Sequence, residues 1–109
     1  MSEEKIREIV NFLRDFLRTR HINIQKIILF GSYAKKKFSE ESDVDLAIIS
    51  KDFEGKDIFQ RAEMLKGLIW AMVRRFRLPF DIVPVSLQEW ENSHSLAVAF
   101  IREGKEIYA

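Results

Sequence analysis

The 109-residue chain contains no cysteine, and this absence excludes several kinds of chemistry at once. Disulfide bonds, thiolate nucleophiles and cysteine-based zinc sites all require that residue. Only two histidines are present, His21 and His94, and two isolated imidazoles do not form a metal-binding set. The N-terminus is charged and lacks the apolar core of a signal peptide. These features lead us to expect a cytoplasmic protein.

The sequence also lacks long apolar runs and an excess of charge of one sign. Uninterrupted apolar runs, such as residues 68–73, are far shorter than a membrane span. The 18 basic and 17 acidic residues nearly cancel, so no global field attracts the chain to nucleic acid or to a membrane. We therefore expect no membrane partner and rank direct nucleic-acid binding last. With 47% apolar residues, the chain is expected to form a single domain over residues 1–109.

Hydrophobic residues recur with helical and strand-like spacings in alternation. Ser2 is a typical helix N-cap, and apolar residues follow it at helical spacing through Leu17. The segments with strand character are residues 26–30, 43–50, 80–85 and 105–108. The segments with helical character are residues 32–37, 58–76, 86–89 and 95–102. This order predicts an α/β (α+β) fold in which helices pack on a small mixed sheet of three or four strands.

The most informative motif is Gly31-Ser32, followed after ten residues by Asp43-Val44-Asp45. Residues two apart on a strand point to the same side, so the two carboxylates would lie roughly 7 Å apart and repel each other. A divalent cation removes that repulsion, and Mg²⁺ prefers a few carboxylates together with phosphate oxygens. Gly31 permits a close approach of backbone to phosphate, and Ser32 would open a turn whose N–H groups bind anions. The motif therefore indicates a site for a Mg-bound nucleoside triphosphate.

A third acid, Asp81, lies inside the otherwise apolar segment 80–85. If this strand neighbours the strand of Asp45, Asp81 can share the metal and take a proton from an attacking hydroxyl. Each signal alone has an ordinary interpretation, such as a turn, a solvated strand end or an edge-strand acid. Four fixed residues match by chance in roughly one chain of this length per thousand, so the conjunction favours a site.

At these residues the chain resembles the nucleotidyltransferases of the DNA polymerase β-like superfamily. The closest resemblance is to its small stand-alone members, the minimal or MntA-like nucleotidyltransferases, and it extends over nearly the whole chain. The segments that carry it are residues 31–35, 42–46, 80–83 and 101–108. One departure is Lys36, which stands where many members have a glycine that can adopt a left-handed conformation.

The resemblance implies a role for each motif residue. Asp43 and Asp45 would hold two Mg²⁺ ions, and Asp81 would complete the metal site and help to activate the acceptor. Gly31 and Ser32 would grip the triphosphate of ATP. In the same turn, Lys35 belongs to a run of three lysines that could contact phosphate or a partner. The reaction would transfer AMP from ATP to a hydroxyl and release pyrophosphate.

The acceptor implied by the resemblance is a tyrosine of a HEPN-type toxin, with this chain as its antitoxin. A second hypothesis is an antitoxin that neutralises its partner by binding alone, through the apolar segment 68–73 and through Trp90 and Phe100. A third is a small-molecule nucleotidyltransferase of the antibiotic-modifying type, working as a homo-oligomer. The sequence leaves the base preference and the oligomeric state open.

Overall fold

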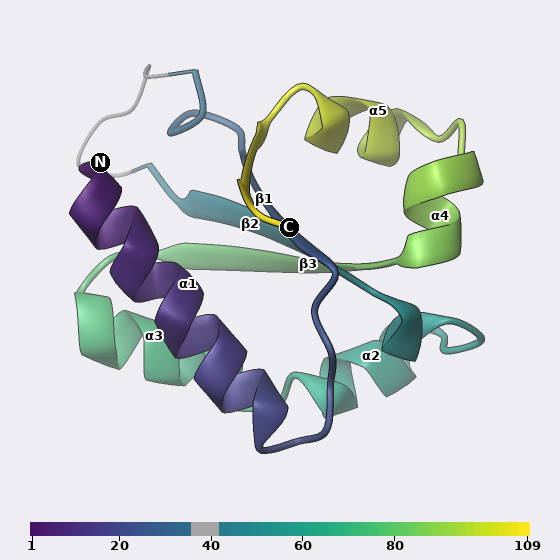
Figure 1. The fold of residues 1–109 in the computed structure, drawn as a ribbon, viewed down its shortest axis with the longest axis horizontal. Coiled ribbons are helices and arrows are strands. Elements are labelled where there is room, and N and C mark those ends of the chain that lie inside the picture. The colour runs from purple at the N-terminus through teal and green to yellow at the C-terminus, as the bar shows by residue number, and fades with distance from the viewer. Residues whose placement is uncertain (36–41) are drawn as a thin grey trace.

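A computed structural model describes residues 1–35 and 42–109 of the chain (Figure 1). Its helices are α1 (Glu3–Arg18), the 3₁₀ helix η1 (Lys51–Phe53), α2 (Ile58–Met64), α3 (Leu68–Phe76), α4 (Leu87–Asn92) and α5 (Leu96–Arg102). Its strands are β1 (Lys26–Phe30), β2 (Val44–Ser50), β3 (Phe80–Ser86) and β4 (Lys105–Tyr108). None of the helices formed by these residues has the length and apolar character that a membrane span requires.

The strands form one mixed sheet in the order β3-β2-β1-β4. β2 runs parallel to β3 and antiparallel to β1, and β4 pairs antiparallel with β1. Every residue of β2 except Asp45 is buried, as expected for a central strand. The predicted α/β architecture, with helices on a small mixed sheet, is confirmed.

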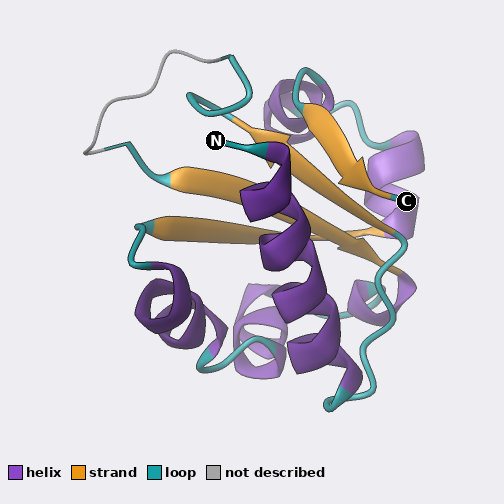
Figure 2. Cartoon of the chain, turned by 60° about the vertical axis from the view of Figure 1, so that its left-hand side comes forward, coloured by secondary structure: helices purple, strands orange, loops and turns teal. Residues whose placement is uncertain are grey.

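Two layers of helices cover the two faces of the sheet (Figures 1 and 2). Leu46 and Ile48 of β2 pack on the side of α1 and α3, in the larger of two apolar clusters. Ala47 and Ile49 point the other way and pack with Val98 and Ile101 of α5. Because side chains alternate along a strand, Asp45 belongs to the α5 side of the sheet.

The first helix forms as the sequence predicts. The Ser2 hydroxyl accepts a hydrogen bond from the backbone N–H of Lys5 at 3.0 Å, which satisfies an otherwise unpaired donor of the first turn. Ile9, Leu13 and Leu17 recur on one side of the helix and are almost fully buried against the sheet. This amphipathic pattern places α1 across the face opposite Asp45.

The prediction of a single helix over residues 58–76 is wrong. Gly67 has a left-handed conformation with φ 83°, and it divides the segment into α2 and α3. The break lets Leu68 and Met72 turn into the core, where both are fully buried. The same rotation leaves Ile69 and Trp70 exposed, so α3 has a second apolar face that the sheet does not cover.

The turn after β1 is described only in part. Gly31–Lys35 form a turn in which the Lys35 N–H donates to the Gly31 carbonyl at 3.2 Å. The remainder of the short helix expected over residues 32–37, including Lys36, lies outside the described residues.

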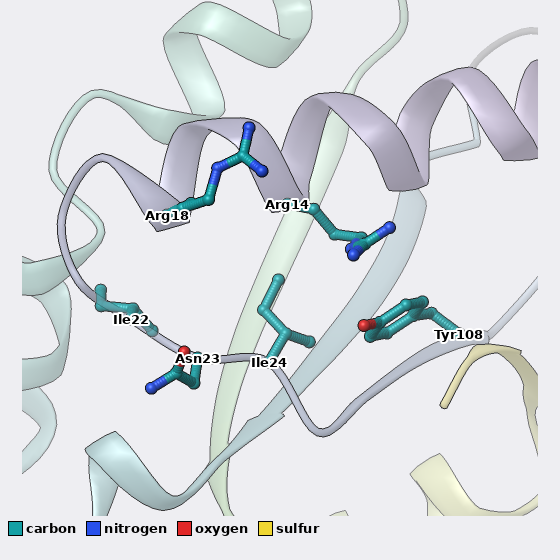
Figure 3. A pocket seen from close by; sticks show the side chains of 6 residues that line it. All are labelled: Arg14, Arg18, Ile22, Asn23, Ile24 and Tyr108. Carbon is teal, nitrogen blue, oxygen red and sulfur yellow. The ribbon is translucent and has the colours of Figure 1, made fainter.

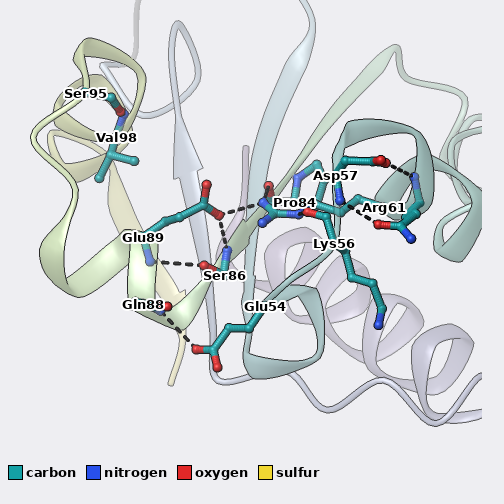
Figure 4. Close-up of polar contacts among 11 residues, drawn as sticks. Glu54, Lys56, Asp57, Arg61, Pro84, Ser86, Gln88, Glu89, Ser95 and Val98 are labelled. Atoms are coloured by element: carbon teal, nitrogen blue, oxygen red, sulfur yellow. Dashed lines mark hydrogen bonds and ion pairs between the residues drawn. The ribbon is translucent and has the colours of Figure 1, made fainter.

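A polar network joins α2 to α4 at the end of β3 (Figure 4). The predicted capping box is present: the Ser86 hydroxyl accepts from the Glu89 N–H at 3.1 Å, and the Glu89 carboxylate accepts from the Ser86 N–H at 2.8 Å. The Arg61 guanidinium of α2 also donates to the Glu89 carboxylate at 2.6 Å. Burial opposes ionisation of Glu89, but these hydrogen bonds outweigh it and lower the pKa of its carboxyl.

Candidate active site

The three predicted acids come from the starts of two neighbouring strands. Asp45 and Asp81 are register partners in the parallel pair β2–β3, so their side chains point to the same face of the sheet. Asp43 immediately precedes β2. In the antiparallel pair β1–β2, Asp45 faces Phe30, the residue before Gly31. The end of β1 therefore meets the starts of β2 and β3 at one edge of the sheet.

The electrostatics of Asp45 reflect both its burial and the two other carboxylates nearby. Burial raises the pKa of the Asp45 carboxyl, and the nearby negative charges of Asp81 and Asp43 raise it further. Asp45 is half-buried, whereas Asp43 and Asp81 are exposed. A positive charge bound among the three would offset both the burial and the repulsion.

Gly31 lies directly against this cluster. Its φ of +72° is in the left-handed region, and a Cβ built on it would lie 2.2 Å from Oδ2 of Asp45. Any side chain at this position would therefore collide with the carboxylate. The glycine brings the backbone of the turn, with Ser32 half-buried beside it, next to the acidic cluster.

Lys35 closes the described part of this turn, and its side chain is exposed. Its ammonium group lies 5.5 Å from the centroid of the Phe100 ring, over the ring face. The structure thus brings Gly31, Ser32 and Lys35 to the same edge of the sheet as the acids, with Lys35 held over an aromatic ring.

The donor set suits Mg²⁺, although it is not a closed cage. Within residues 1–35 and 42–109, no three acidic or histidine side chains are already gathered at metal-ligand geometry. Mg²⁺ usually needs only one or two carboxylates, with substrate phosphates and water completing its coordination. Asp45, beside two further carboxylates and a backbone cradle for phosphate, fits that mode of binding.

The sequence motifs did not indicate that two aromatic rings, those of Phe30 and Phe100, lie beside the site. Phe30 and Phe100 meet edge to face, with ring centroids 5.8 Å apart and planes at 88°. Phe30 precedes the motif directly, but the position of Phe100 depends on the packing of α5 against β1. A hollow of about 150 Å³ lies apart from the acids, between α1, the segment 22–24 and Tyr108 (Figure 3).

Residues 8–109 match the family model described as Polymerase beta, Nucleotidyltransferase. The chain belongs to this family. Among curated proteins of Methanocaldococcus jannaschii, it is 52% identical over 56 residues to MJ0604, which is named as a candidate protein adenylyltransferase. That match covers 50% of this chain and 53% of MJ0604, so it spans about half of each protein. MJ0141, named in the same way, is 31% identical over 73% of this chain and 74% of its own length.

Solved structures show the same fold. A toxin–antitoxin crystal structure with AMP-PNP superposes with a TM-score of 0.63 and 21% identity, covering 91% of this chain and 72% of the other. A mutant of the toxin–antitoxin pair MntA–HpeT superposes with a TM-score of 0.61 and 22% identity, covering 100% and 74%. At such identities the likeness concerns the fold alone.

Proposed function

We propose that this chain is a Mg-dependent nucleotidyltransferase that moves AMP from ATP to a hydroxyl group. The observation that carries the proposal is the Gly31 backbone against the Asp45 carboxylate, with Asp81 beside Asp45 in strand register. Membership of the nucleotidyltransferase family supports the same reaction class. A cradle for phosphate and an acidic cluster for a cation are the two parts that such a reaction needs.

In this proposal each residue of the site has its own role. The Gly31–Ser32 backbone binds the terminal phosphates, and Lys35 adds a positive charge to that grip. Asp43, Asp45 and Asp81 would hold two Mg²⁺ ions, which when bound offset negative charge on the triphosphate and on the leaving pyrophosphate. The acceptor oxygen forms a bond to the α-phosphorus, and the bond from that phosphorus to the bridging oxygen of pyrophosphate breaks. Asp81, exposed at the strand edge, accepts the proton of the acceptor hydroxyl.

The proposed acceptor is a tyrosine of a HEPN-type toxin that forms a pair with this chain in the cytoplasm. Support comes from relatives named as candidate protein adenylyltransferases and from the toxin–antitoxin structures that share the fold. It also comes from the exposure of Asp43 and Asp81, which leaves the acidic cluster open to a large acceptor.

A direct test is to incubate the chain with ATP, Mg²⁺ and the product of the neighbouring gene. We expect the intact mass of the partner to increase by one or more AMP units and tandem mass spectrometry to locate them on tyrosine. The matched control is Asp43→Asn with Asp45→Asn, which keeps side-chain size and removes two negative charges. No mass gain under conditions where the two proteins bind each other would refute the transferase function.

One observation favours a second function, neutralisation by binding alone. The outer face of α3 exposes Ile69, Trp70 and Val73, and α2 exposes Ile58 and Phe59. We call these five residues the α2–α3 apolar surface. A groove of about 370 Å³ lies beside it, between α2, α3 and β3. Exposed aromatic and aliphatic side chains on two successive helices are typical of a protein interface.

The two functions are separable because they use different parts of the molecule. If the double asparagine variant folds and still neutralises the partner, binding alone suffices. If neutralisation is lost while binding persists, transfer of AMP is required.

A further inference from the structure

An exposed aromatic ring, that of Phe100, lies beside the proposed triphosphate cradle. Phe100 lies on α5, the helix that packs on the Asp45 side of the sheet. The buried anchors of that helix are Val98 and Ile101, which are 6% and 3% exposed. Phe100 is 46% exposed, and its ring meets that of Phe30 edge to face. Val98 and Ile101 therefore bury α5 in the core, while much of the Phe100 ring stays open to solvent.

The position of the ring is fixed relative to the site. Phe30, which contacts Phe100, is the register partner of Asp45 and the residue immediately before Gly31. Lys35, at the other end of the described turn, places its ammonium group over the Phe100 ring. The ring is thus connected to both ends of the turn that would hold the phosphates.

We propose that Phe100 is the stacking platform for the nucleobase of the bound nucleoside triphosphate. The proposal rests on the function proposed above, because it assumes that the phosphates occupy the Gly31–Ser32 turn. Lys35 is attracted to the ring as a cation in the free protein. When a triphosphate binds, its stronger negative charge draws Lys35 away and leaves the ring face open to the base.

Stacking on a phenyl ring has a consequence for specificity. Every nucleobase has a flat π-face, so a stacking platform adds affinity without distinguishing one base from another. Phe100 should therefore strengthen the binding of ATP and GTP by a similar factor. It should add no affinity for inorganic tripolyphosphate, which has no base, and its loss would free Lys35 for the phosphates.

The test compares ATP, GTP and inorganic tripolyphosphate, each titrated with Mg²⁺ into the full chain by calorimetry. Phe100→Leu keeps an apolar side chain against Phe30 and removes the aromatic face. We expect it to weaken ATP and GTP binding by about tenfold, a typical loss for one stacked base, and not to weaken tripolyphosphate binding. Phe100→Trp, which keeps an aromatic face, should retain ATP affinity within about twofold of the unmodified chain.

Leu96→Ala is the matched control, because Leu96 lies one turn earlier on α5 and is 89% exposed. It should not change the affinity for any of the three ligands. Lys35→Met should weaken ATP and tripolyphosphate alike, since it acts on phosphate.

Each alternative outcome has a distinct meaning. Equal ATP affinity of Phe100→Leu and the unmodified chain would overturn the stacking role while leaving the transferase proposal intact. A parallel loss of ATP and tripolyphosphate would assign Phe100 a structural role instead. If the unmodified chain binds neither ligand in the presence of Mg²⁺, the proposed function itself fails, and the stacking role with it.

Discussion

The contact between the Gly31 backbone and the Asp45 carboxylate links the shape of the turn to the charge of the strand. Two features favour glycine at position 31. Its φ is positive, and the Asp45 carboxylate occupies the space that a side chain would need. Gly55 has a similar φ of +74°, but a Cβ there would meet nothing within 4 Å. Comparing substitutions at Gly31 and Gly55 therefore distinguishes the cost of backbone strain from the cost of a steric collision.

We predict that Gly31→Ala is much more damaging than Gly55→Ala. The left-handed conformation costs a residue with a Cβ about 1–2 kcal/mol at either position, and only Gly31→Ala adds the collision with Asp45. Urea unfolding should show about 1–2 kcal/mol of destabilisation for Gly55→Ala and a larger loss for Gly31→Ala. Mg-ATP binding should be lost in Gly31→Ala and retained in Gly55→Ala. Equal losses of stability in the two variants would contradict the steric argument.

Asp45 is expected to destabilise the free protein at neutral pH. The pKa of its carboxyl is raised above the ordinary value of 3.8, first by burial and then by Asp81 and Asp43. For a raised carboxyl pKa, the protonated form is favoured by folding. That stabilisation is complete below the unfolded pKa and is lost as pH rises through the folded pKa.

Without metal or nucleotide, Asp45→Asn should therefore have a higher Tm than the unmodified chain at neutral pH. The difference should vanish below the ordinary carboxyl pKa, where Asp45 is protonated in both states. Asp81→Asn should give part of the gain, because it removes one of the two neighbouring charges. Thermal unfolding over a pH series measures both effects, and a lower Tm for Asp45→Asn at neutral pH would reject this account of the acidic cluster.

At the scale of elements, the cap of α4 also joins this helix to α2. Ser86 is 3% exposed, and with Glu89 it forms reciprocal hydrogen bonds that also engage Arg61 of α2. Ser95 caps α5 through one bond, from the Val98 N–H at 3.2 Å. Removing Ser86 therefore disturbs a network that joins two elements, whereas removing Ser95 disturbs one helix end.

Ser86→Ala should destabilise the chain by about 2 kcal/mol and Ser95→Ala by about 0.5–1 kcal/mol, the upper and lower parts of the range for N-caps. The midpoints of urea unfolding measure the two losses. A Ser86→Ala loss no greater than that of Ser95→Ala would show that the link to Arg61 adds nothing to the cap.

Local signals predicted most of these elements, and the exceptions have physical reasons. The caps at Ser2 and Ser86 and the continuous apolar run of β2 depend on neighbours in sequence, so they could be inferred from the chain alone. The break at Gly67 could not, because a glycine in an apolar helical pattern is tolerated unless tertiary packing demands a turn. Here the core takes up Leu68 and Met72, and the two halves of the segment separate.

The candidate site divides in the same way. The sequence pattern predicted a common side for Asp43 and Asp45 from the period of a strand, but β2 begins at Val44, so only Asp45 lies on the strand itself. Asp81 lies opposite Asp45 because β2 and β3 are parallel neighbours. The sequence could not establish that the two strands pair, so the meeting of the two acids was predicted only for the case that they do. Phe100 was expected to be exposed but not to lie at the acidic edge. Its place is set by how α5 returns over β1, a contact between segments far apart in the chain.

At the scale of the whole molecule, the proposed site and the α2–α3 apolar surface lie on opposite sides of the sheet. The acids and α5 share one face, whereas α3 packs with α1 on the other. A partner held by the α2–α3 apolar surface would not cover the acidic edge directly. Binding and transfer should therefore respond to different substitutions.

Trp70 is the best residue for testing this separation. It is 65% exposed, and the Arg74 guanidinium lies 5.1 Å from its ring centroid. Exposed tryptophan and arginine are the residue types most often responsible for binding energy at protein interfaces. Trp70→Ala should weaken partner binding by about 30-fold or more, the effect of an interface hot spot, while Mg-ATP affinity stays unchanged.

The complementary variant is Asp43→Asn with Asp45→Asn, which should abolish AMP transfer while partner binding remains within about twofold. Affinity for the partner is measured by biolayer interferometry and transfer by intact mass. Leu96→Ala serves as the control on the opposite face, since Leu96 is the most exposed of the large apolar side chains on α5. If Leu96→Ala weakens partner binding and Trp70→Ala does not, the interface lies on the side of the acids. The partner would then be held directly over the acidic edge, and the α2–α3 apolar surface would not be its docking site.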